Sequence, residues 1–285
     1  SIVVPEDGWS SENVDDIARA IATERLHNSG FNCVATQVVV IPEAWQRADE
    51  FVAALRRHLA GAPERPAYYP GASSRQLAVV TVHPDAGVLG GDPEAPRTLV
   101  DHLDPEKADE HLFTVEAFGP VLGVVRLPGS REPQAFLDAA VRFANERLAG
   151  TLGAGIHIHP RTREALGEHF DRAVAELRYG TIGINAWTGT VFGMPGGSWG
   201  AFPGHTLDDV GSGIGVVHNA LLLAPEHIER TVGTGVWKPS PTPLWFVDNR
   251  TAHVTARRLT RFAGIDSWVI AAPIGAAAID SYRKG

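Results

Sequence analysis

The stretch NSGFNCVATQVVVI (residues 28–41) joins a polar turn to a run of β-forming residues, and it holds Cys33, the only cysteine of 285 residues. The residues after Cys33 predict a buried strand, because they form a short and largely apolar run. Gly30 permits a positive φ where the chain reverses, and Asn28 and Asn32 can hydrogen-bond to the backbone of the turn. We therefore expect Cys33 in an accessible turn at the N-terminal edge of a strand. A lone cysteine is more often a small buried hydrophobe, so its position alone does not identify a nucleophile.

Helix-like and strand-like segments alternate on both sides of this stretch. Helices are indicated by apolar residues at 3.6-residue spacing, and strands by short apolar runs. Strands are expected over the opening SIVVP, 34–41, 77–82, 121–127, 153–159, 181–185 and 244–249, and helices over 10–29, 42–60, 132–148, 162–179 and 250–264. Strands separated by helices of this length indicate crossover connections. We predict an α/β fold with a mostly parallel sheet and helices on both faces.

The composition changes after residue 185. Residues 186–215 are rich in glycine, which is typical of loops rather than of a core. We expect one main domain over residues 1–219 and a C-terminal extension over residues 220–285, packed on the same domain. A chain of this length can bury roughly 75% of its unfolded surface, which is enough for one large core with a small annex.

Charge and cysteine content exclude several classes of protein. The formal net charge is −8, which argues against a nucleic-acid partner and against an anionic membrane surface. One cysteine cannot form an internal disulfide, and the opening SIVVPEDGWSSE lacks the pattern of a signal peptide. The longest apolar stretch, residues 268–279, is too short to span a bilayer and contains a proline. We expect a cytoplasmic protein.

Two motifs suggest a cofactor loop or a metal site, but each is incomplete. GSGIGVV (residues 211–217) resembles a dinucleotide-binding loop, but the third glycine would stand where Val216 does, and no acidic residue follows about 20 positions later. His157 and His159 share one face of a strand, yet no further ligand occurs at a fixed spacing. We therefore predict no metal site.

A third motif, GGSWG (residues 196–200), matches the nucleophile elbow of α/β-hydrolases. That elbow needs a strand before the serine and a helix directly after it, whereas Ser198 is followed by AFPGH, which does not readily begin a helix. Asp248 and His253 come later in the order that a Ser–Asp–His triad would require. A serine hydrolase that uses Ser198 therefore remains an alternative.

Five segments in order resemble the aldehyde dehydrogenase superfamily over residues 2 to about 205. The segment around Cys33 resembles the family's nucleophile motif N-x-G-Q-x-C-x-A. The other four are VEAFGPVLGVV (115–125), which resembles E-I-F-G-P-V; RFANERLAGTLGAGIHI (142–158), which resembles A-N-x-x-x-Y-G-L-x-A-x-V; RYGTIGINAW (178–187), which resembles G-x-V-x-V-N; and PGGSWGAFPGH (195–205), which stands where P-F-G-G-x-K-x-S-G-x-G would be. The resemblance implies the fold of the family's catalytic domain for residues 1–219.

The resemblance also implies roles for particular residues. Cys33 would attack an aldehyde carbon to give a thiohemiacetal, which passes a hydride to NAD or NADP and leaves a thioester for water to cleave. The backbone N–H of Cys33 would be one donor to the oxyanion. Glu116 would accept hydrogen bonds from the nicotinamide ribose, and Phe118 would pack near the nicotinamide. Asn185 would brace the loops of the site.

The chain departs from the family pattern in several places. Phe31 replaces the glutamine that follows the glycine of the nucleophile motif, and Pro195 replaces an aromatic residue of the substrate tunnel. The family carries its cofactor domain, its oxyanion asparagine and its general-base glutamate before a stretch like SIVVP. We therefore expect the catalytic portion of a longer chain, whose missing N-terminal cofactor domain is its partner, with negligible dehydrogenase activity alone. We also expect self-association through the apolar face that such a portion exposes.

Rival functions stay open at this point. A CoA-acylating aldehyde dehydrogenase would transfer the same thioester to CoA instead of water. A non-catalytic relative would keep the fold as an assembly or binding module, which Phe31 and Pro195 favour. The residues give no choice among aldehydes or between NAD and NADP, and they give no function for residues 220–285.

Overall fold

The computed structural model describes residues 1–6, 8–265, 274–276 and 279, which form two compact units, Ser1–Trp237 and Lys238–Gly285. The division falls later than the expected domain end at residue 219, because the strand Thr231–Thr234 pairs within the sheet of the first unit. The packing of the expected extension 220–285 on that domain stays a prediction. The apolar stretch 268–279 lies largely outside the described residues.

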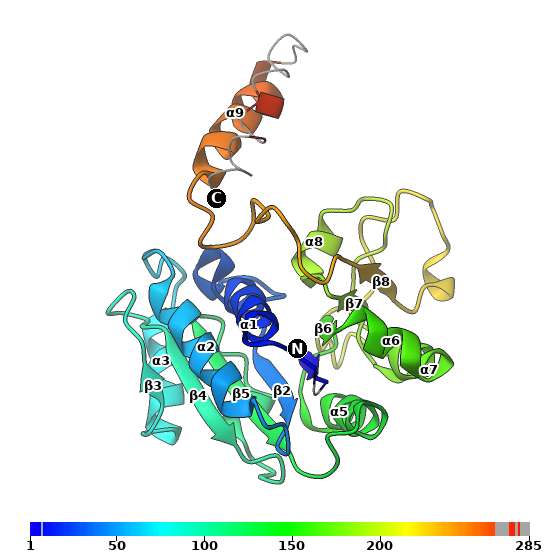
Figure 1. Cartoon of the computed structure of the whole chain (residues 1–285). Coiled ribbons are helices and arrows are strands. Elements are labelled where there is room, and N and C mark those ends of the chain that lie inside the picture. Colours follow the sequence, from blue (N-terminus) through cyan, green and yellow to red (C-terminus); the bar gives the residue numbers. More distant parts are fainter. Residues whose placement is uncertain (7, 266–273, 277–278, 280–285) are drawn as a thin grey trace. The chain divides into compact units, whose positions relative to one another are not determined.

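The first unit is built on an eight-stranded sheet with the order β3-β4-β5-β2-β1-β6-β7-β8 (Figure 1). Every neighbouring pair is parallel except β3 and β4, so the predicted mostly parallel sheet is confirmed. The strands are β1 (Ile2–Val4), β2 (Val38–Pro42), β3 (Gly87–Val88), β4 (Thr98–Leu103), β5 (Val121–Leu127), β6 (Gly153–Ile158), β7 (Thr181–Ile184) and β8 (Thr231–Thr234).

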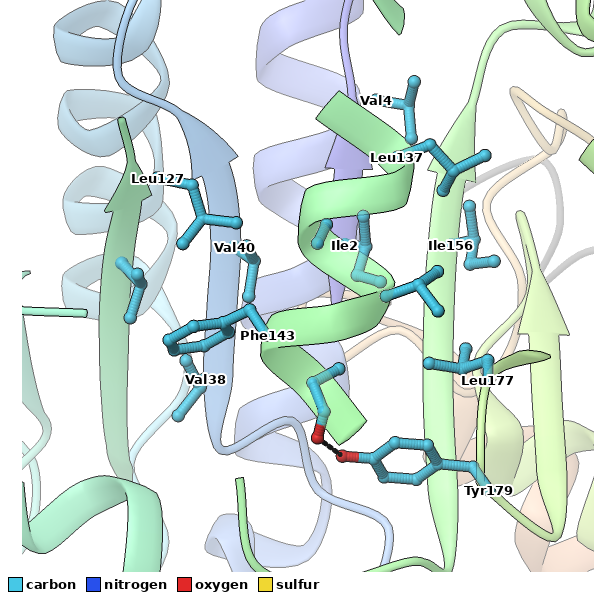
Figure 2. Close-up of a cluster of buried hydrophobic side chains, with 14 of the residues drawn as sticks. Ile2, Val4, Val38, Val40, Leu127, Leu137, Phe143, Ile156, Leu177 and Tyr179 are labelled. Atoms are coloured by element: carbon cyan, nitrogen blue, oxygen red, sulfur yellow. Dashed lines mark hydrogen bonds between the residues drawn. The ribbon is translucent and has the colours of Figure 1, made fainter. Parts of the chain in front are cut away.

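Helices cover both faces of this sheet. Figure 2 shows α5 in front of β2 and β6, while α1 and α2 lie behind the strands. The helices of the first unit are α1 (Ser11–Leu26), α2 (Ala48–Gly61), α3 (Ala72–Val82), α4 (His111–Thr114), α5 (Pro133–Arg147), α6 (Pro160–Leu166), α7 (Glu168–Glu176) and α8 (Thr188–Phe192), with the short 3₁₀ segments η1 (His27–Gly30) and η2 (Pro225–His227). The predicted α/β fold with helices on both faces is therefore confirmed.

The central strands are apolar on both sides, as buried parallel strands must be. In β2, Val38 and Val40 belong to the core cluster beneath α5 (Figure 2), and the alternating residues Val39 and Ile41 are buried on the opposite side. At the edge of this cluster the hydroxyl of Tyr179 donates to the carbonyl of Ala144 at 3.2 Å. Burial raises the pKa of Tyr179 to about 12, so this hydroxyl keeps its proton.

Three predicted elements were wrong. Residues 77–82 are the end of helix α3, in which only one side of the helix is buried, while Leu77 and Val82 are exposed. The single helix expected over 162–179 is broken into α6 and α7 by Gly167, whose φ is +52°. Residues 244–249 form turns closed by backbone hydrogen bonds rather than a strand. Strands β3, β4 and β8 were not predicted.

The second unit holds the predicted basic helix, which is α9 (Ala252–Ile265). Asn249 organises the turn before it: its side-chain oxygen accepts from the backbone N–H of Thr251 at 3.0 Å. Its amide nitrogen donates to the carbonyls of Thr242 and Pro243. The helix at 250–264 is thus confirmed in place.

Candidate active site

Helix α1 runs directly into the turn that carries Cys33. Asn28 and Ser29 have φ of 55° and 57°, and Gly30 has φ of 81°, so three successive residues adopt the left-handed region. The side chain of Asn28 donates to the carbonyl of Phe31 at 3.2 Å, and that of Asn32 donates to the carbonyl of His27 at 2.8 Å. These are the contacts expected of the two asparagines. They turn the chain toward β2 and leave the Cys33 side chain exposed.

Glu116 and Phe118 lie in the loop between α4 and β5, beside the cysteine turn. The two loops touch through their backbones: a Cβ atom added to Gly30 would stand 2.6 Å from the carbonyl oxygen of Gly119. The Glu116 carboxylate is exposed and accepts a hydrogen bond of 3.4 Å from the side chain of Gln37. Phe118 is half-buried and has a φ of 37°.

Cys33 and Glu116 line one cavity of about 570 Å³. Its wall also includes Gln37, Trp187 and Thr188, and the cavity lies near the N-terminal ends of β2 and β6. Phe118 is not part of this lining, so two of the three predicted site residues share the cavity and the third does not. A cavity of this size can enclose a small organic molecule.

Phe118 belongs instead to an aromatic cluster formed with Phe31, Tyr68 and Tyr69. The ring centroids of Tyr69 and Phe118 are 4.7 Å apart, and those of Phe31 and Phe118 are 6.0 Å apart. Arg75 lies over the rings of Tyr69 and Phe118, and it donates to the carbonyls of Ala117 and Phe118 at 3.1 and 3.2 Å. The cluster fixes the loop of Glu116, but the sequence did not reveal it, because Tyr68 and Tyr69 come from an irregular segment.

The electrostatic surroundings disfavour the Cys33 thiolate. Desolvation by the surrounding groups raises the pKa of Cys33; a hydrogen bond to its own backbone N–H lowers it, and the carboxylate of Glu116 raises it again, so the net shift is upward. Desolvation also raises the pKa of Glu116, although Arg25 and Arg75 oppose that shift. The C-terminal end of α1 points toward the cysteine turn, and its partial negative charge acts in the same direction.

A buried pair, Glu24 and His157, was not predicted from the sequence, and Glu24 lines the cavity. The carboxylate of Glu24 is 3.5 Å from Nε2 of His157 and accepts from the hydroxyl of Thr36 at 2.9 Å. Burial alone would raise the pKa of Glu24, but His157 and Thr36 bring it below its ordinary value. One signal was available: Glu24 and Arg25 continue the apolar face of α1 at helical spacing after Ile21.

The two strand histidines do not form a metal site. His157 faces Glu24, while Nδ1 of His159 lies 3.6 Å from Glu6. Within the described part of the chain, no group of three His, Cys, Asp or Glu side chains is arranged to hold a metal ion.

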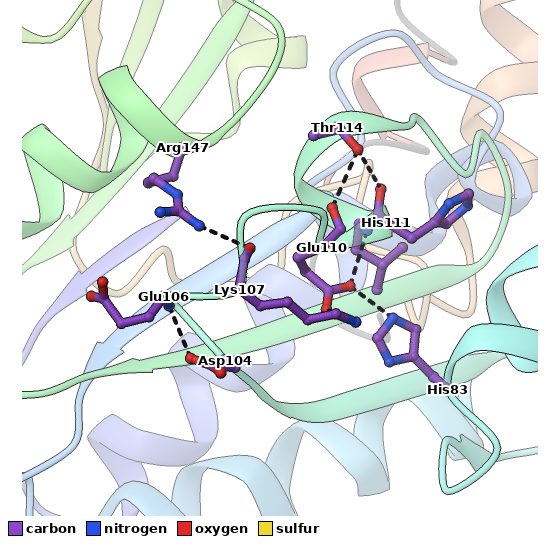
Figure 3. A network of polar contacts seen from close by, with 9 residues as sticks. His83, Asp104, Glu106, Lys107, Glu110, His111, Thr114 and Arg147 are labelled. Atoms are coloured by element: carbon purple, nitrogen blue, oxygen red, sulfur yellow. Dashed lines mark hydrogen bonds and ion pairs between the residues drawn. The ribbon is translucent and has the colours of Figure 1, made fainter.

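Asn185 and a second buried network connect elements of the first unit. The side-chain oxygen of Asn185 accepts from the N–H of Ile158 at 2.9 Å, and its nitrogen donates to the carbonyl of Ile158 at 2.8 Å, so it joins the end of β7 to the end of β6. That Asn185 braces the loops of the site stays a prediction. Figure 3 shows the second network, in which buried Glu110 pairs with His83 at 2.8 Å and with Lys107 at 3.2 Å. Glu110 caps α4, the helix that leads into the loop of Glu116.

Ser198 does not stand in a nucleophile elbow. Its hydroxyl pairs with that of Thr231 at 2.9 Å. Among the described residues after Ser198, the first α-helix begins only at Ala252, so no helix follows the serine directly. Asp248 and His253 belong to the second unit. GSGIGVV likewise lies in turns without the strand and helix that a dinucleotide loop connects.

Known proteins with a similar sequence are aldehyde dehydrogenases. The salicylaldehyde dehydrogenases of Pseudomonas sp. (strain C18) and of Pseudomonas putida are each 28% identical over 196 residues, covering 62% of this chain. The chain spans about a third of the length of these relatives, since the match covers 36% of each. No family model matches the sequence.

Solved structures with a similar fold include aldehyde dehydrogenases. A salicylaldehyde dehydrogenase from Pseudomonas putida G7 complexed with salicylaldehyde matches with a TM-score of 0.56 at 22% identity, over 75% of this chain and 41% of that one. An indole-3-acetaldehyde dehydrogenase in complex with NAD⁺ matches with a TM-score of 0.56 at 18% identity, over 76% and 42% of the two chains.

The described residues contain no helix that is long and apolar enough to cross a membrane. The expected resemblance is confirmed: this chain is similar in sequence to salicylaldehyde dehydrogenases, and over about three quarters of its length it is similar in fold to solved aldehyde dehydrogenases.

Proposed function

We propose that this chain carries the cysteine-bearing portion of an NAD(P)-dependent aldehyde dehydrogenase. One observation carries the proposal: Cys33 is exposed at the N-terminal edge of β2 and lines the same cavity as Glu116. Sequence similarity to salicylaldehyde dehydrogenases supports an aldehyde as the substrate class.

In the proposed reaction, the Cys33 thiolate attacks the aldehyde carbon and a carbon–sulfur bond forms. The proton of the thiol leaves before this attack, and a backbone N–H at the turn stabilises the oxygen of the thiohemiacetal. A bound NAD or NADP would supply the hydride acceptor that oxidation of the thiohemiacetal to a thioester requires. Water then cleaves the thioester and releases the acid and the free thiol.

The residues present fit one end of such a cofactor. The carboxylate of Glu116 is exposed on the cavity and can accept hydrogen bonds from ribose hydroxyls, whereas Phe118 does not line the cavity. In the described residues no glycine-rich turn leads from a strand into a helix N-terminus, which is the usual place for a pyrophosphate. We propose that the rest of the cofactor site, and the general base for thioester cleavage, lie outside this chain.

The raised pKa of Cys33 agrees with an incomplete site. Since the thiolate is the reactive species, a chain that holds mainly the thiol at neutral pH is slow to begin the reaction. We therefore expect negligible oxidation of aldehydes by this chain alone with NAD⁺ or NADP⁺. Clear turnover of several aldehydes by the purified chain, lost in Cys33→Ala, would contradict the proposed incompleteness while supporting the role of Cys33.

A non-catalytic binding module remains the second candidate, because Phe31 and Tyr69 cover the ring of Phe118. Alkylation by iodoacetamide separates the two, since the chain has one cysteine. The catalytic proposal expects labelling of Cys33 in the native chain, at a rate that rises with pH. Labelling only after denaturation would favour the module.

The remaining proposals concern assembly and location. Exposed apolar side chains between residues 207 and 223, among them Leu207, Leu221 and Leu222, support self-association. A cytoplasmic location stays a prediction from the sequence.

A further inference from the structure

The last turn of α1 carries Arg25 on the buried side of the helix. Arg25 follows Ile21 at helical spacing, and its side chain has no exposed area. A buried guanidinium is costly to desolvate, so its hydrogen-bond partners indicate what it does. Burial lowers the pKa of Arg25 to about 10, which leaves it protonated at neutral pH.

Arg25 binds both ends of the cysteine turn. Its Nη1 donates to the carbonyl of Thr36 at 3.0 Å, and its Nη2 donates to the carbonyl of Gly30 at 2.8 Å. These carbonyls lie three residues after and three residues before Cys33. One rigid, planar group therefore sets the distance between the two ends of the turn.

Other hydrogen bonds hold the cysteine turn at further points. The indole N–H of Trp187 donates to the carbonyl of Val34 at 3.0 Å. Glu24, the neighbour of Arg25 in α1, accepts from the hydroxyl of Thr36. Consecutive residues of one helix thus hold the backbone and the side chain of the same threonine.

We propose that Arg25 is a positioning residue for Cys33, holding the cysteine turn in the shape that presents the thiol to the cavity. The inference rests on the role of Cys33 in the proposed function, and it adds a residue that does not touch the reacting atoms. A lysine could reach one of the two carbonyls but could not bridge both, because an ammonium lacks the planar fork of a guanidinium.

The pKa of the Cys33 thiol depends on the conformation of the turn. The largest effect on the pKa of Cys33 is desolvation by the groups around the thiol, which raises it. A turn released at one end exposes the sulfur to more water, so the pKa of Cys33 falls toward its ordinary value. More thiolate then forms at a given pH, and alkylation becomes faster.

The experiment measures the rate of iodoacetamide alkylation against pH for the wild-type chain, Arg25→Lys, Arg25→Met and the control Arg230→Lys. Arg230 is a matched control, because its Nη1 donates to three carbonyls at the end of α7, those of Val174, Ala175 and Leu177. It does not line the cavity. The two lysine variants therefore lose comparable arginine–carbonyl contacts in different places.

We expect the apparent pKa of Cys33 to fall in Arg25→Lys, so that alkylation below that pKa is about threefold faster than in the wild type. Arg25→Met also removes a positive charge, which by itself disfavours the thiolate, so the charge-preserving Arg25→Lys is the decisive variant. Arg230→Lys should match the wild type even if its melting temperature drops. If Arg25→Met does not fold, Arg25→Lys decides.

An unchanged pH profile in folded Arg25→Lys would overturn the proposal. So would unfolding of Arg25→Lys under conditions in which Arg230→Lys stays folded, since Arg25 would then support the whole unit rather than the turn. Alkylation needs neither aldehyde nor cofactor, so this outcome is separate from failure of the proposed dehydrogenase function.

Discussion

Replacing Gly30 by alanine tests the contact between the cysteine turn and the loop of Glu116. Gly30 has a φ of +81°, and an added Cβ would lie 2.6 Å from the oxygen and 2.7 Å from the carbon of the Gly119 carbonyl. Gly90 is the matched control: its φ is +87°, and nothing lies within 4 Å of an added Cβ. The two substitutions share the backbone strain and differ in the collision.

The expected losses in the free energy of unfolding follow from the backbone strain and from the collision. A left-handed alanine costs roughly 1–2 kcal/mol, offset by about 0.4–1 kcal/mol because alanine also restricts the unfolded chain. Gly90→Ala should therefore lower the free energy of unfolding by about 1 kcal/mol. Gly30→Ala adds an overpacking cost of about 1–3 kcal/mol, because the atoms it meets are backbone and cannot rotate away, for a total of about 2–4 kcal/mol.

Urea unfolding followed by tryptophan fluorescence measures both values. Alkylation of Cys33 in the native state is a second measurement, and Gly30→Ala alone should change its rate. Equal losses of stability in the two variants, within about 0.5 kcal/mol, would refute the close backbone contact between the two loops.

Three further predictions concern the charge, the brace and the exposed apolar segment. Glu116→Gln removes an anion that disfavours the thiolate, so the apparent pKa of Cys33 should fall. Alkylation should then be faster than in the wild type below the wild-type pKa and equally fast well above it. A slower reaction would contradict this reasoning. Asn185→Ala should lower the free energy of unfolding by about 2–3 kcal/mol, because the variant loses two hydrogen bonds to Ile158 and keeps a φ of +51°. Asn185→Gly should lower it by less, because glycine adopts this φ without strain. Equal losses in urea unfolding would argue against backbone strain at this position. Leu222, which is 88% exposed, should contribute to self-association, so light scattering should give a lower mass for Leu222→Asp than for the wild type. A monomeric wild-type chain would contradict the proposed self-association.

Local features of the sequence predicted much of the fold and the cysteine turn. Gly30, Asn28 and Asn32 act through contacts within a few residues, which a sequence motif can encode. The run 121–127 was predicted at its exact bounds, because a buried parallel strand is apolar along its whole length.

Features made by distant residues could not be predicted in this way. His157 lies far along the chain from Glu24, and Tyr69 reaches Phe118 from an irregular loop. The short, largely apolar run 77–82 predicts a strand, but it forms the end of helix α3, of which one side is buried. Tertiary contacts thus determined what local propensity did not.

The most direct test of the nucleophile is acylation of Cys33 by p-nitrophenyl acetate. The thiolate attacks the ester carbonyl, a carbon–sulfur bond forms, and p-nitrophenolate leaves. We expect release of up to about one equivalent of nitrophenolate per chain, without rapid turnover, because the proposed general base lies outside this chain. Intact mass spectrometry should find one acetyl group on Cys33 and none in Cys33→Ser. Native chain that stays unmodified over the pH range in which its denatured form reacts would contradict the account.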